Sequence, residues 1–570
     1  MLNSQRSCIV QRDFTVLLDT SHPGFEEARQ QLSCFAELIK SLSTFYTYRM
    51  TRISLWNAAA TGWSASDIVN TLQQLSKWDV PQKLIQDIEQ LVLRYGKLLL
   101  VPDDSDEHII HLECTDDKLL QEIISYPSLS IYWEVDDSAA RIKVVSSMRG
   151  HLKQELMRLG YPVIDLVGYH LGKPLHFGLA KQLPDGSDFR LRSYQQDAIR
   201  AFEGSQTAAG GSGVLVLPCG AGKTVIGIGI MERFQCETLI LTSNSTSVKQ
   251  WINEIVSTTS LSASDIGEYS GLKKEVKPIT VATYQILTHR KSKDDPFEHM
   301  KLFDERDWGL IIYDEVHLLP APVFRATADI QATRRLGLTA TLVREDGCEQ
   351  DVFSLIGPKR FEVPWKELEK QGWIARVECE EWRVDMPRTT LERYRLAEKK
   401  EQFRIAAENS NKLPVIRQLL NKHLGLPALI IGQYIDQLKE IAAKLNAPLI
   451  SGEMPQQQRN EWYAKFKEGK VPVIVVSKVA NFAVDLPDAA VAIQVSGSFG
   501  SRQEEAQRLG RILRPKKDSN TAFFYTIVSQ DTREQDFALR RQLFLIEQGY
   551  EYSIHYVNEE ELGMEAISGT

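Results

Sequence analysis

The stretch VLVLPCGAGKTVIGIGIMERF, residues 214–234, decides the fold class of this chain. An apolar run typical of a strand leads into a glycine-containing turn, which a helical pattern follows. Glycines let backbone N–H groups approach phosphate oxygens, and the positive N-terminal end of the following helix would face the same anion. The stretch therefore predicts a phosphate-binding loop inside an α/β domain.

Two side chains of this loop carry the expected chemistry. Lys223 is expected to reach the β- and γ-phosphates of a nucleotide, and Thr224 to place its hydroxyl on Mg²⁺. The full pattern G-x-x-x-x-G-K-[ST] is not met, because Leu217 stands at the position of the first glycine. A glycine-rich turn before a core helix is the alternative, but the order of strand, loop, Gly-Lys-Thr and helix favours phosphate binding. The other nucleotide-binding residues predicted in the loop are Gly220, Ala221 and Gly222.

A second apolar run, GLIIYDE at 309–315, ends in two carboxylates. Ligands of α/β sheets bind outside the carboxyl ends of the strands. Asp314 is therefore expected to hold Mg²⁺, directly or through water, and Glu315 to orient and deprotonate the attacking water. An Asp-Glu pair alone would more often be a solvated turn; with the phosphate loop upstream, it favours nucleotide hydrolysis with ATP and Mg²⁺ as cofactors.

The strand-like runs fall into two sets separated by about 100 residues. Each run is apolar on both faces, which is typical of buried parallel strands. Two such sets, alternating with helical segments, predict two α/β domains in tandem. The runs lie at 214–218, 238–242, 279–283 and 309–315, and then at 428–432, 471–477 and 491–496.

Residues 1–165 have a different texture, with short helices and short strands. Helical patterns at 66–76 and 81–95 are followed by the apolar strand KLLLV, which suggests a winged-helix-like unit. A second small α+β unit would end near Asp165. Breaker residues then make 166–188 a predicted linker.

Composition limits the possible functions. Of the 570 residues, 43% are hydrophobic and 25% are charged, which is ordinary for a globular protein. The sequence contains no run of 18 apolar residues, so it predicts no membrane-spanning helix. The net charge is −8, from 67 Lys and Arg against 75 Asp and Glu, so any nucleic acid must bind in a local groove. The seven scattered cysteines form no Cys-x-x-Cys pair, which indicates a reducing, cytoplasmic compartment.

Several of these residues resemble the motifs of a known family. Asp314-Glu315-Val316-His317 and Thr339-Ala340-Thr341 resemble the DExH box and motif III of superfamily 2 helicases. The block GLTATLVREDG, 337–347, is similar to XPB-type DNA repair helicases, whose Arg-Glu-Asp motif follows motif III at this spacing. The resemblance covers about 190–530 and implies two RecA-like domains with ATP between them.

Further motifs of the family occur in the expected order. Arg192 and Gln195 resemble the Q-motif, in which Gln195 would recognise adenine, and Asp485 is similar to a motif V residue that contacts the nucleotide. Arg511 and Arg514 are three residues apart, so on a helix they would share one face, and across a cleft they could neutralise charge on the transferred phosphoryl group. With Gln507 they resemble motif VI.

The resemblance also implies residues that bind nucleic acid or couple the two sites. His317, Thr339 and Thr341 would couple the ATP site to the rest of the motor. The expected nucleic-acid contacts are Thr242, Ser243, Thr283, Tyr284, Arg344, Glu345, Asp346, Ser477 and Lys478.

The resemblance implies an ATP-dependent DNA helicase with 3′ to 5′ polarity that acts in repair on forked or partly single-stranded DNA. The alternatives are a double-stranded DNA translocase that does not separate strands, an RNA helicase with a DExH box, and an ATP-dependent scaffold. Since no nuclease signature occurs, cutting would need a partner protein. The predicted helicase domains are 189–375 and 376–545, with a thumb-like insertion at 389–411 and a tail at 546–570.

Overall fold

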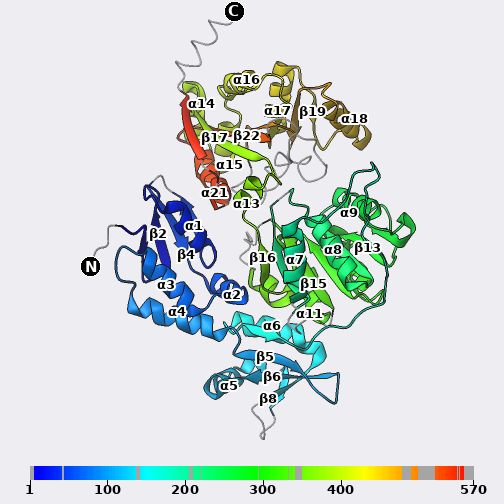
Figure 1. Cartoon of the computed structure of the whole chain (residues 1–570). Helices are drawn as coiled ribbons and strands as arrows, with labels where there is room; N and C mark the ends of the chain where they lie inside the picture. The colour runs from blue at the N-terminus through cyan, green and yellow to red at the C-terminus, as the bar shows by residue number, and fades with distance from the viewer. Residues whose placement is uncertain are drawn as a thin grey trace, which may run out of the picture. The chain divides into compact units, whose positions relative to one another are not determined.

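The chain forms two compact units, which are described one at a time (Figure 1). Met1–Leu217 with Gly222–Val363 make up the first unit, and Pro364–Thr570 with Pro218–Ala221 make up the second. The computed structural model describes residues 5–41, 44–135, 141–204, 210–218, 220–292, 294–331, 333–340, 349–477, 489–497, 520–547, 550 and 552–557.

The first unit contains a seven-stranded parallel sheet, ordered β12-β13-β11-β14-β15-β10-β16. Four of the predicted strands are confirmed in it, with ends that differ by at most two residues. The strands are β10 (Ser212–Val216), β11 (Thr238–Thr242), β12 (Ile266–Tyr269), β13 (Ile279–Thr283), β14 (Leu310–Asp314), β15 (Arg334–Thr339) and β16 (Lys359–Glu362).

Helices cover both faces of this sheet, which explains why strands such as β11 and β14 are apolar on both faces. Ile311 and Tyr313 of β14 belong to the core on one face, and their neighbour Ile312 is equally buried on the other. The helices are α7 (Ser193–Glu203), α8 (Lys223–Phe234), α9 (Ser245–Thr258), α10 (Tyr284–Leu287) and α11 (Ala321–Asp329), with a π-helical turn, η7, at Val352–Ile356.

The N-terminal region of this unit holds two smaller sheets. The first is antiparallel, in the order β1-β2-β4-β3, and the second has the order β7-β8-β6-β5-β9. The predicted helices at 66–76 and 81–95 are confirmed as α3 and α4, and the strand after them is β5. The elements are β1 (Cys8–Val10), β2 (Thr15–Asp19), α1 (Phe25–Ser33), β3 (Glu37–Ser41), β4 (Phe45–Arg49), α2 (Arg52–Ala60), α3 (Ala65–Leu75), α4 (Gln82–Arg94), β5 (Leu98–Pro102), β6 (Ile109–Cys114), α5 (Asp117–Ile124), β7 (Trp133–Val135), β8 (Arg141–Val145), α6 (Arg149–Arg158) and β9 (Val163–Asp165).

The N-terminal region packs directly on the large sheet's domain. The Phe353 ring lies 6.3 Å from both Trp56 and Tyr95, measured between ring centroids. Gln154 Nε2 donates to Asp351 Oδ1 at 2.6 Å, and α6 approaches α11 so closely that a Cβ on Gly150 would stand 2.1 Å from the Ala328 carbonyl oxygen. These contacts join residues far apart in sequence into one unit.

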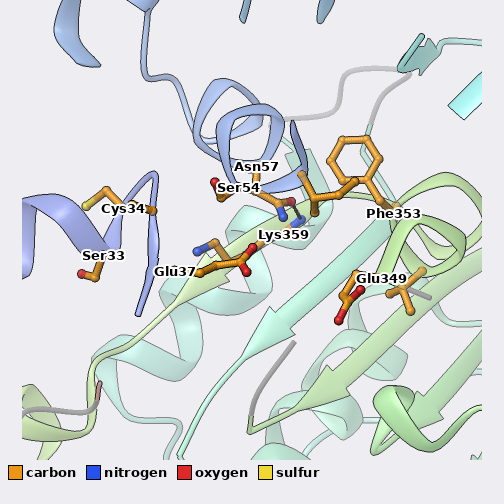
Figure 2. Close-up of a pocket in the computed structure, with 12 residues that line it drawn as sticks. Ser33, Cys34, Glu37, Ser54, Asn57, Glu349, Phe353 and Lys359 are labelled. Carbon is orange, nitrogen blue, oxygen red and sulfur yellow. Dashed lines mark hydrogen bonds between the residues drawn. The ribbon is translucent and has the colours of Figure 1, made fainter. Parts of the chain in front are cut away.

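A small pocket of about 110 Å³ remains in this contact (Figure 2). Cys34, Glu37 and Asn57 line it from the N-terminal side, and Phe353 and Lys359 line it from the other. The Lys359 backbone N–H donates to Asn57 Oδ1 at 3.0 Å, so a hydrogen bond joins the two sides of the pocket. We regard it as a packing gap of the interface.

The predicted linker follows the surface of the large domain and makes backbone contacts with it. Residues 166–188 form no helix or strand. Their backbone nevertheless bonds to the domain: Lys173 N donates to the Asp307 carbonyl at 2.9 Å, and Ala180 N donates to the Thr258 carbonyl at 2.8 Å. The segment is therefore a tether that lies along the domain rather than a free spacer.

A buried charge cluster also joins the N-terminal region to the large sheet. Arg149 and Lys153 both bind Asp165, at 2.7 and 2.8 Å, and the buried Arg335 guanidinium is close enough to act on them electrostatically. Burial and the neighbouring cations lower the pKa of Lys153 to about 7. Burial alone would raise the pKa of Asp165, but the charges of Lys153 and Arg149 outweigh it and hold that pKa below its usual range.

Asp165→Asn is expected to lower the free energy of unfolding of this unit by about 3–5 kcal/mol, because it leaves buried cations without their counter-charge. Because the folded pKa of Asp165 is depressed, its contribution is present above the unfolded pKa near 3.8 and is lost only as the pH falls below it. Denaturant unfolding at pH 7 measures the loss. As a control, Asp329→Asn removes an exposed carboxylate that pairs with His151 and should change stability by less than about 1 kcal/mol. Equal losses in both variants would contradict the prediction.

The second unit contains another seven-stranded parallel sheet, ordered β19-β20-β18-β21-β22-β17-β23. Together the two sheets confirm the predicted fold class. The segment 389–411, predicted to be a thumb-like insertion, contains most of two helices, α14 and α15. The elements are α13 (Trp365–Lys370), β17 (Arg376–Val384), α14 (Arg388–Leu396), α15 (Lys399–Ala407), α16 (Lys412–Lys422), β18 (Ala428–Gly432), α17 (Ile435–Leu445), β19 (Leu449–Ile450), α18 (Gln456–Lys467), β20 (Val473–Ser477), β21 (Val491–Gln494), β22 (Thr521–Ser529), α21 (Arg533–Glu547) and β23 (Tyr552–Val557).

Among the described helices, none has the length and apolar character that a membrane-spanning helix needs.

Candidate nucleotide site

The phosphate loop connects β10 to the start of α8. Gly222 precedes α8 with φ +73°, in the left-handed region that side chains other than glycine's rarely adopt. A Cβ at this position would also stand 2.7 Å from Gln195 Nε2. Gly222 is therefore required twice, by its backbone angle and by the close approach of the Gln195 amide.

Arg192 and Gln195 are brought to this loop by the start of α7. Gln195 is buried, and its Oε1 accepts from the Arg192 backbone N–H at 2.9 Å in a capping arrangement. The Gln195 side chain is thus fixed in one orientation, with its amide nitrogen against Gly222.

Lys223, Asp314 and Glu315 form the centre of the site. Lys223 Nζ donates to Glu315 Oε1 at 3.0 Å, although the two residues are 92 positions apart. Parallel neighbours of the sheet bring them together, since β14 and β10 both end at the carboxyl edge on either side of β15. Thr224 follows Lys223 in the first turn of α8 and is partly exposed.

The surroundings of the two carboxylates shift their pKa values in opposite directions. Burial and the neighbouring Glu315 raise the pKa of Asp314 to about 6. Burial also acts to raise the pKa of Glu315, but the Lys223 charge outweighs it and lowers that pKa below its ordinary value. Glu315 is therefore ionised near neutral pH. Its Oε2 is buried, accepts no hydrogen bond from any residue that the structure describes, and lies 3.5 Å from His317 Nδ1.

Two aromatic residues support Asp314. Trp251 Nε1 of α9 donates to Asp314 Oδ2 at 2.9 Å, and the Tyr284 hydroxyl donates to the Asp314 carbonyl at 2.8 Å. The supporting role of Trp251 was not predicted from the sequence, because nothing in its local pattern distinguishes it from a core tryptophan.

Glu315 and His317 stand in an unusual turn after β14. Glu315 has φ 52°, a left-handed angle that is uncommon for a residue with a side chain. His317 Nδ1 lies 2.8 Å from Thr339 Oγ1, at the end of β15, and 3.5 Å from Glu315 Oε2. Thus His317 and Thr339, two of the three predicted coupling residues, are in contact beside the acid.

The predicted nucleic-acid residues of the first sheet lie on the same carboxyl edge: Thr242 and Thr283 end β11 and β13, and Ser243 and Tyr284 follow them directly. Thr242, Thr283 and Tyr284 are buried, however, and their hydroxyls already take part in local hydrogen bonds. Ser243 is partly exposed. In the second unit, Ser477 ends β20 and is buried.

The remaining predicted site residues lie outside the described residues. They are Thr341, Arg344, Glu345, Asp346, Lys478, Asp485, Gln507, Arg511 and Arg514.

The fold and this site define a class. Two tandem parallel sheets, with a phosphate-loop lysine bonded to a strand-end glutamate on the first, make the chain an ATP hydrolase of the superfamily 2 helicase type. Family models agree: "Type III restriction enzyme, res subunit" matches residues 188–344, "ERCC3/RAD25/XPB C-terminal helicase" matches 368–567, and "Helicase conserved C-terminal domain" matches 8–132.

Relatives cover nearly the whole chain. The "DNA 3'-5' helicase XPB" of Kineococcus radiotolerans is 50% identical over 96% of both chains, and that of Mycobacterium tuberculosis is 48% identical over 96% of this chain and 97% of its own. A Danio rerio protein named "General transcription and DNA repair factor IIH helicase/translocase subunit XPB" is 32% identical over 97% of this chain and 79% of its own. The chain belongs to the XPB family of DNA helicases, which confirms the predicted family and enzyme class.

Proposed function

We propose that this chain uses ATP hydrolysis to move 3′ to 5′ along DNA and open the duplex during repair. The observation that carries the proposal is the Lys223–Glu315 contact at the carboxyl edge of the first sheet, next to Asp314. The names of the relatives support DNA as the substrate and 3′ to 5′ as the polarity.

The residues of the site suit a nucleotide with Mg²⁺. Mg²⁺ usually binds one or two carboxylates together with substrate phosphates, rather than a cage of protein ligands. The Asp314 carboxylate, which Trp251 holds in place, and the partly exposed Thr224 hydroxyl are ligands of that kind. Asp314 and Thr224 would hold Mg²⁺, which when bound would neutralise charge on the phosphates.

The residues of the site would then each have a role in binding or hydrolysing the nucleotide. Gly220, Ala221 and Gly222 would present backbone N–H groups to the phosphates, and Lys223 would add a positive charge. Glu315, which is ionised and has one oxygen without a hydrogen bond among the described residues, would take the proton of the attacking water. Gln195 would bind adenine near the loop.

The second domain would complete the reaction. Arg511 and Arg514 would neutralise charge that develops on the transferred phosphoryl group, with Gln507 and Asp485 near the nucleotide. His317, Thr339 and Thr341 would pass the change at Glu315 on to the neighbouring strand. The Glu315–His317–Thr339 contacts support this order of coupling in the first domain.

DNA would cross the carboxyl edge of the first sheet. Because the hydroxyls of Thr242, Thr283 and Tyr284 are buried, we propose that these residues position the backbone, while Ser243 and exposed neighbours contact the phosphates. Ser477, Lys478 and the Arg344-Glu345-Asp346 group would contact the DNA strand beyond this edge. We also propose the domain limits predicted from the sequence, a cytoplasmic location and a nuclease as a partner protein.

Trp251→Phe is expected to raise the Mg²⁺ concentration needed for half-maximal ATP turnover by about tenfold or more, because the carboxylate of Asp314 loses its supporting hydrogen bond. The matched control is Trp308→Phe. It loses a hydrogen bond from Trp308 Nε1 to the Leu302 carbonyl in the same domain, and it should affect stability alone. An unchanged Mg²⁺ requirement in Trp251→Phe would contradict the positioning role.

Forked DNA tests the function directly. ATP turnover and strand separation are measured with forks that carry either a 3′ or a 5′ single-stranded arm. The proposal expects separation of the 3′-armed fork only. Turnover stimulated by plain duplex without any strand separation would favour the translocase that the "helicase/translocase" relative suggests. Stimulation by RNA alone would favour an RNA helicase, and negligible turnover with every nucleic acid would favour a scaffold.

A further inference from the structure

Two arginines of the N-terminal region converge on one point at the surface. Arg52 is the first residue of α2, and Arg94 is the last residue of α4. A Cβ placed on Gly160 would stand 3.0 Å from Arg52 Nη1 and 3.7 Å from Arg94 Nη1. The two guanidinium groups are therefore close neighbours, although they come from different helices.

These two charges have no acidic partner in the described part of the chain. Arg94 contacts the Gly160 carbonyl at 3.5 Å and lies over the Tyr161 ring, and Arg52 makes no ion pair. Several other cations of the region are paired, including Lys77 with Asp19, Lys97 with Asp116 and Arg141 with Glu113. Because neighbouring like charges repel, the arrangement favours an anion between the two arginines.

A pocket of about 380 Å³ lies where the arginines meet. Its wall includes the Phe14 ring, Met50 and Gln90, so it offers an apolar side and an amide in addition to the guanidinium groups. Asp87 also lines it, but Lys83 Nζ binds its carboxylate at 2.8 Å and offsets that charge. The volume is within the ~300–1,000 Å³ that ligand pockets have.

The backbone holds this pocket in shape. Phe14 adopts a left-handed angle, φ 67°, in the turn between β1 and β2, and its carbonyl accepts from Met50 N at 2.9 Å. The start of α2, which carries Arg52, is fixed by a capping box between Thr51 and Ser54. The arginines therefore project from anchored elements rather than from a loose loop.

We propose that Arg52 and Arg94 form a binding site for one phosphodiester group of DNA, outside the helicase motifs. Arginine presents planar pairs of N–H donors that match phosphate oxygens, and two such forks on one phosphate fix its position. The inference rests on the proposed function, because it takes DNA as the anion that this chain encounters. In a region whose net charge is −6, from 16 Lys and Arg against 22 Asp and Glu in residues 1–165, it gives DNA one defined contact.

Salt dependence of DNA binding tests the site. The logarithm of the binding constant falls with the logarithm of salt concentration by about 0.9 for each phosphate contact on duplex DNA. The full-length Arg52→Gln/Arg94→Gln variant should therefore bind forked DNA with a slope shallower by about 0.9 than that of the unchanged chain. Binding is measured without ATP, so the result does not depend on turnover, and the fork-unwinding experiment tests the proposed function separately.

Matched variants define the outcome. Arg12→Gln/Arg49→Gln removes two exposed arginines from the same region and should keep the original slope, and Arg52→Lys/Arg94→Lys retains the charge and should keep most of it. Since Arg52 is exposed, Arg52→Gln alone repeats the test if the double variant unfolds early. An unchanged slope, or an equal loss in the Arg12/Arg49 variant, overturns the proposal. If the slope is unchanged but inorganic phosphate raises the melting temperature only when both arginines are present, the site binds a small anion and not DNA, which also overturns the proposal.

Discussion

Glu315→Gln is expected to leave ATP binding nearly intact and to reduce ATP turnover by a factor of about 10²–10⁴, the usual contribution of a general base. Glutamine keeps the shape of the side chain and can still accept from Lys223, but its amide cannot take the proton of water. The pKa of Glu315 is lowered by Lys223, so the wild-type residue is ready to accept a proton at neutral pH. Binding of a fluorescent ATP analogue and release of phosphate with DNA present measure the two effects separately.

Glu268→Gln is the matched control. Glu268 is a buried carboxylate of β12 in the same domain and accepts from the Ser270 hydroxyl at 2.7 Å, away from the nucleotide site. This variant should turn ATP over at a near-normal rate. If Glu315→Gln retained turnover within tenfold of the unchanged chain, another residue would have to act as the base.

Lys223→Ala is expected to weaken ATP binding and to lower turnover by at least about 10²–10³, the cost of removing one donor aimed at developing charge. The loss has two parts. The phosphates lose a positive charge, and the buried Glu315 loses the cation that keeps it ionised, so its pKa should rise. Turnover measured between pH 6 and 9 should therefore recover slightly at high pH without reaching the original rate.

An exposed lysine in the same domain gives the comparison for Lys223. Lys301→Ala should leave ATP binding and turnover unchanged. Thermal unfolding of both variants shows whether the domain remains folded. Near-normal turnover in a folded Lys223→Ala variant would remove the phosphate-loop assignment.

The position of the candidate nucleotide site could be predicted because it lies where apolar parallel strands end. The runs at 238–242, 279–283 and 428–432 coincide with β11, β13 and β18. Parallel pairing places the ends of such strands along one edge, so the contact between Lys223 and Glu315 follows from two short motifs.

Several of the strands that were missed have mixed composition. β17 reads RVECEEWRV, which alternates polar and apolar residues, yet it pairs with both β22 and β23. The buried Glu381 is tolerated there because Arg383 binds it at 2.6 Å, a compensation that no local pattern reveals. Hydrogen bonds to the backbone also explain why Thr283 and Tyr284 are buried: Thr283 Oγ1 accepts from the nearby Ile286 N, and the Tyr284 hydroxyl donates to the distant Asp314 carbonyl.

The packing of the N-terminal region on the first helicase domain was equally hidden. It depends on Phe353 meeting Trp56 and Tyr95, and on Arg335 sharing a buried cluster with Asp165. Each of these residues looks like an ordinary core or surface residue in its own segment. Their meeting is a property of the folded chain.

That packing limits how this protein can be rearranged. A shortened form that begins after Asp165 would present the Phe353 ring to water and leave the Arg335 guanidinium without a nearby carboxylate. Swapping the first 165 residues for those of a distant relative would meet the same mismatch unless the facing surface of the motor were swapped as well. Natural recombination and laboratory chimeras should therefore succeed only when both sides of the seam are inherited together.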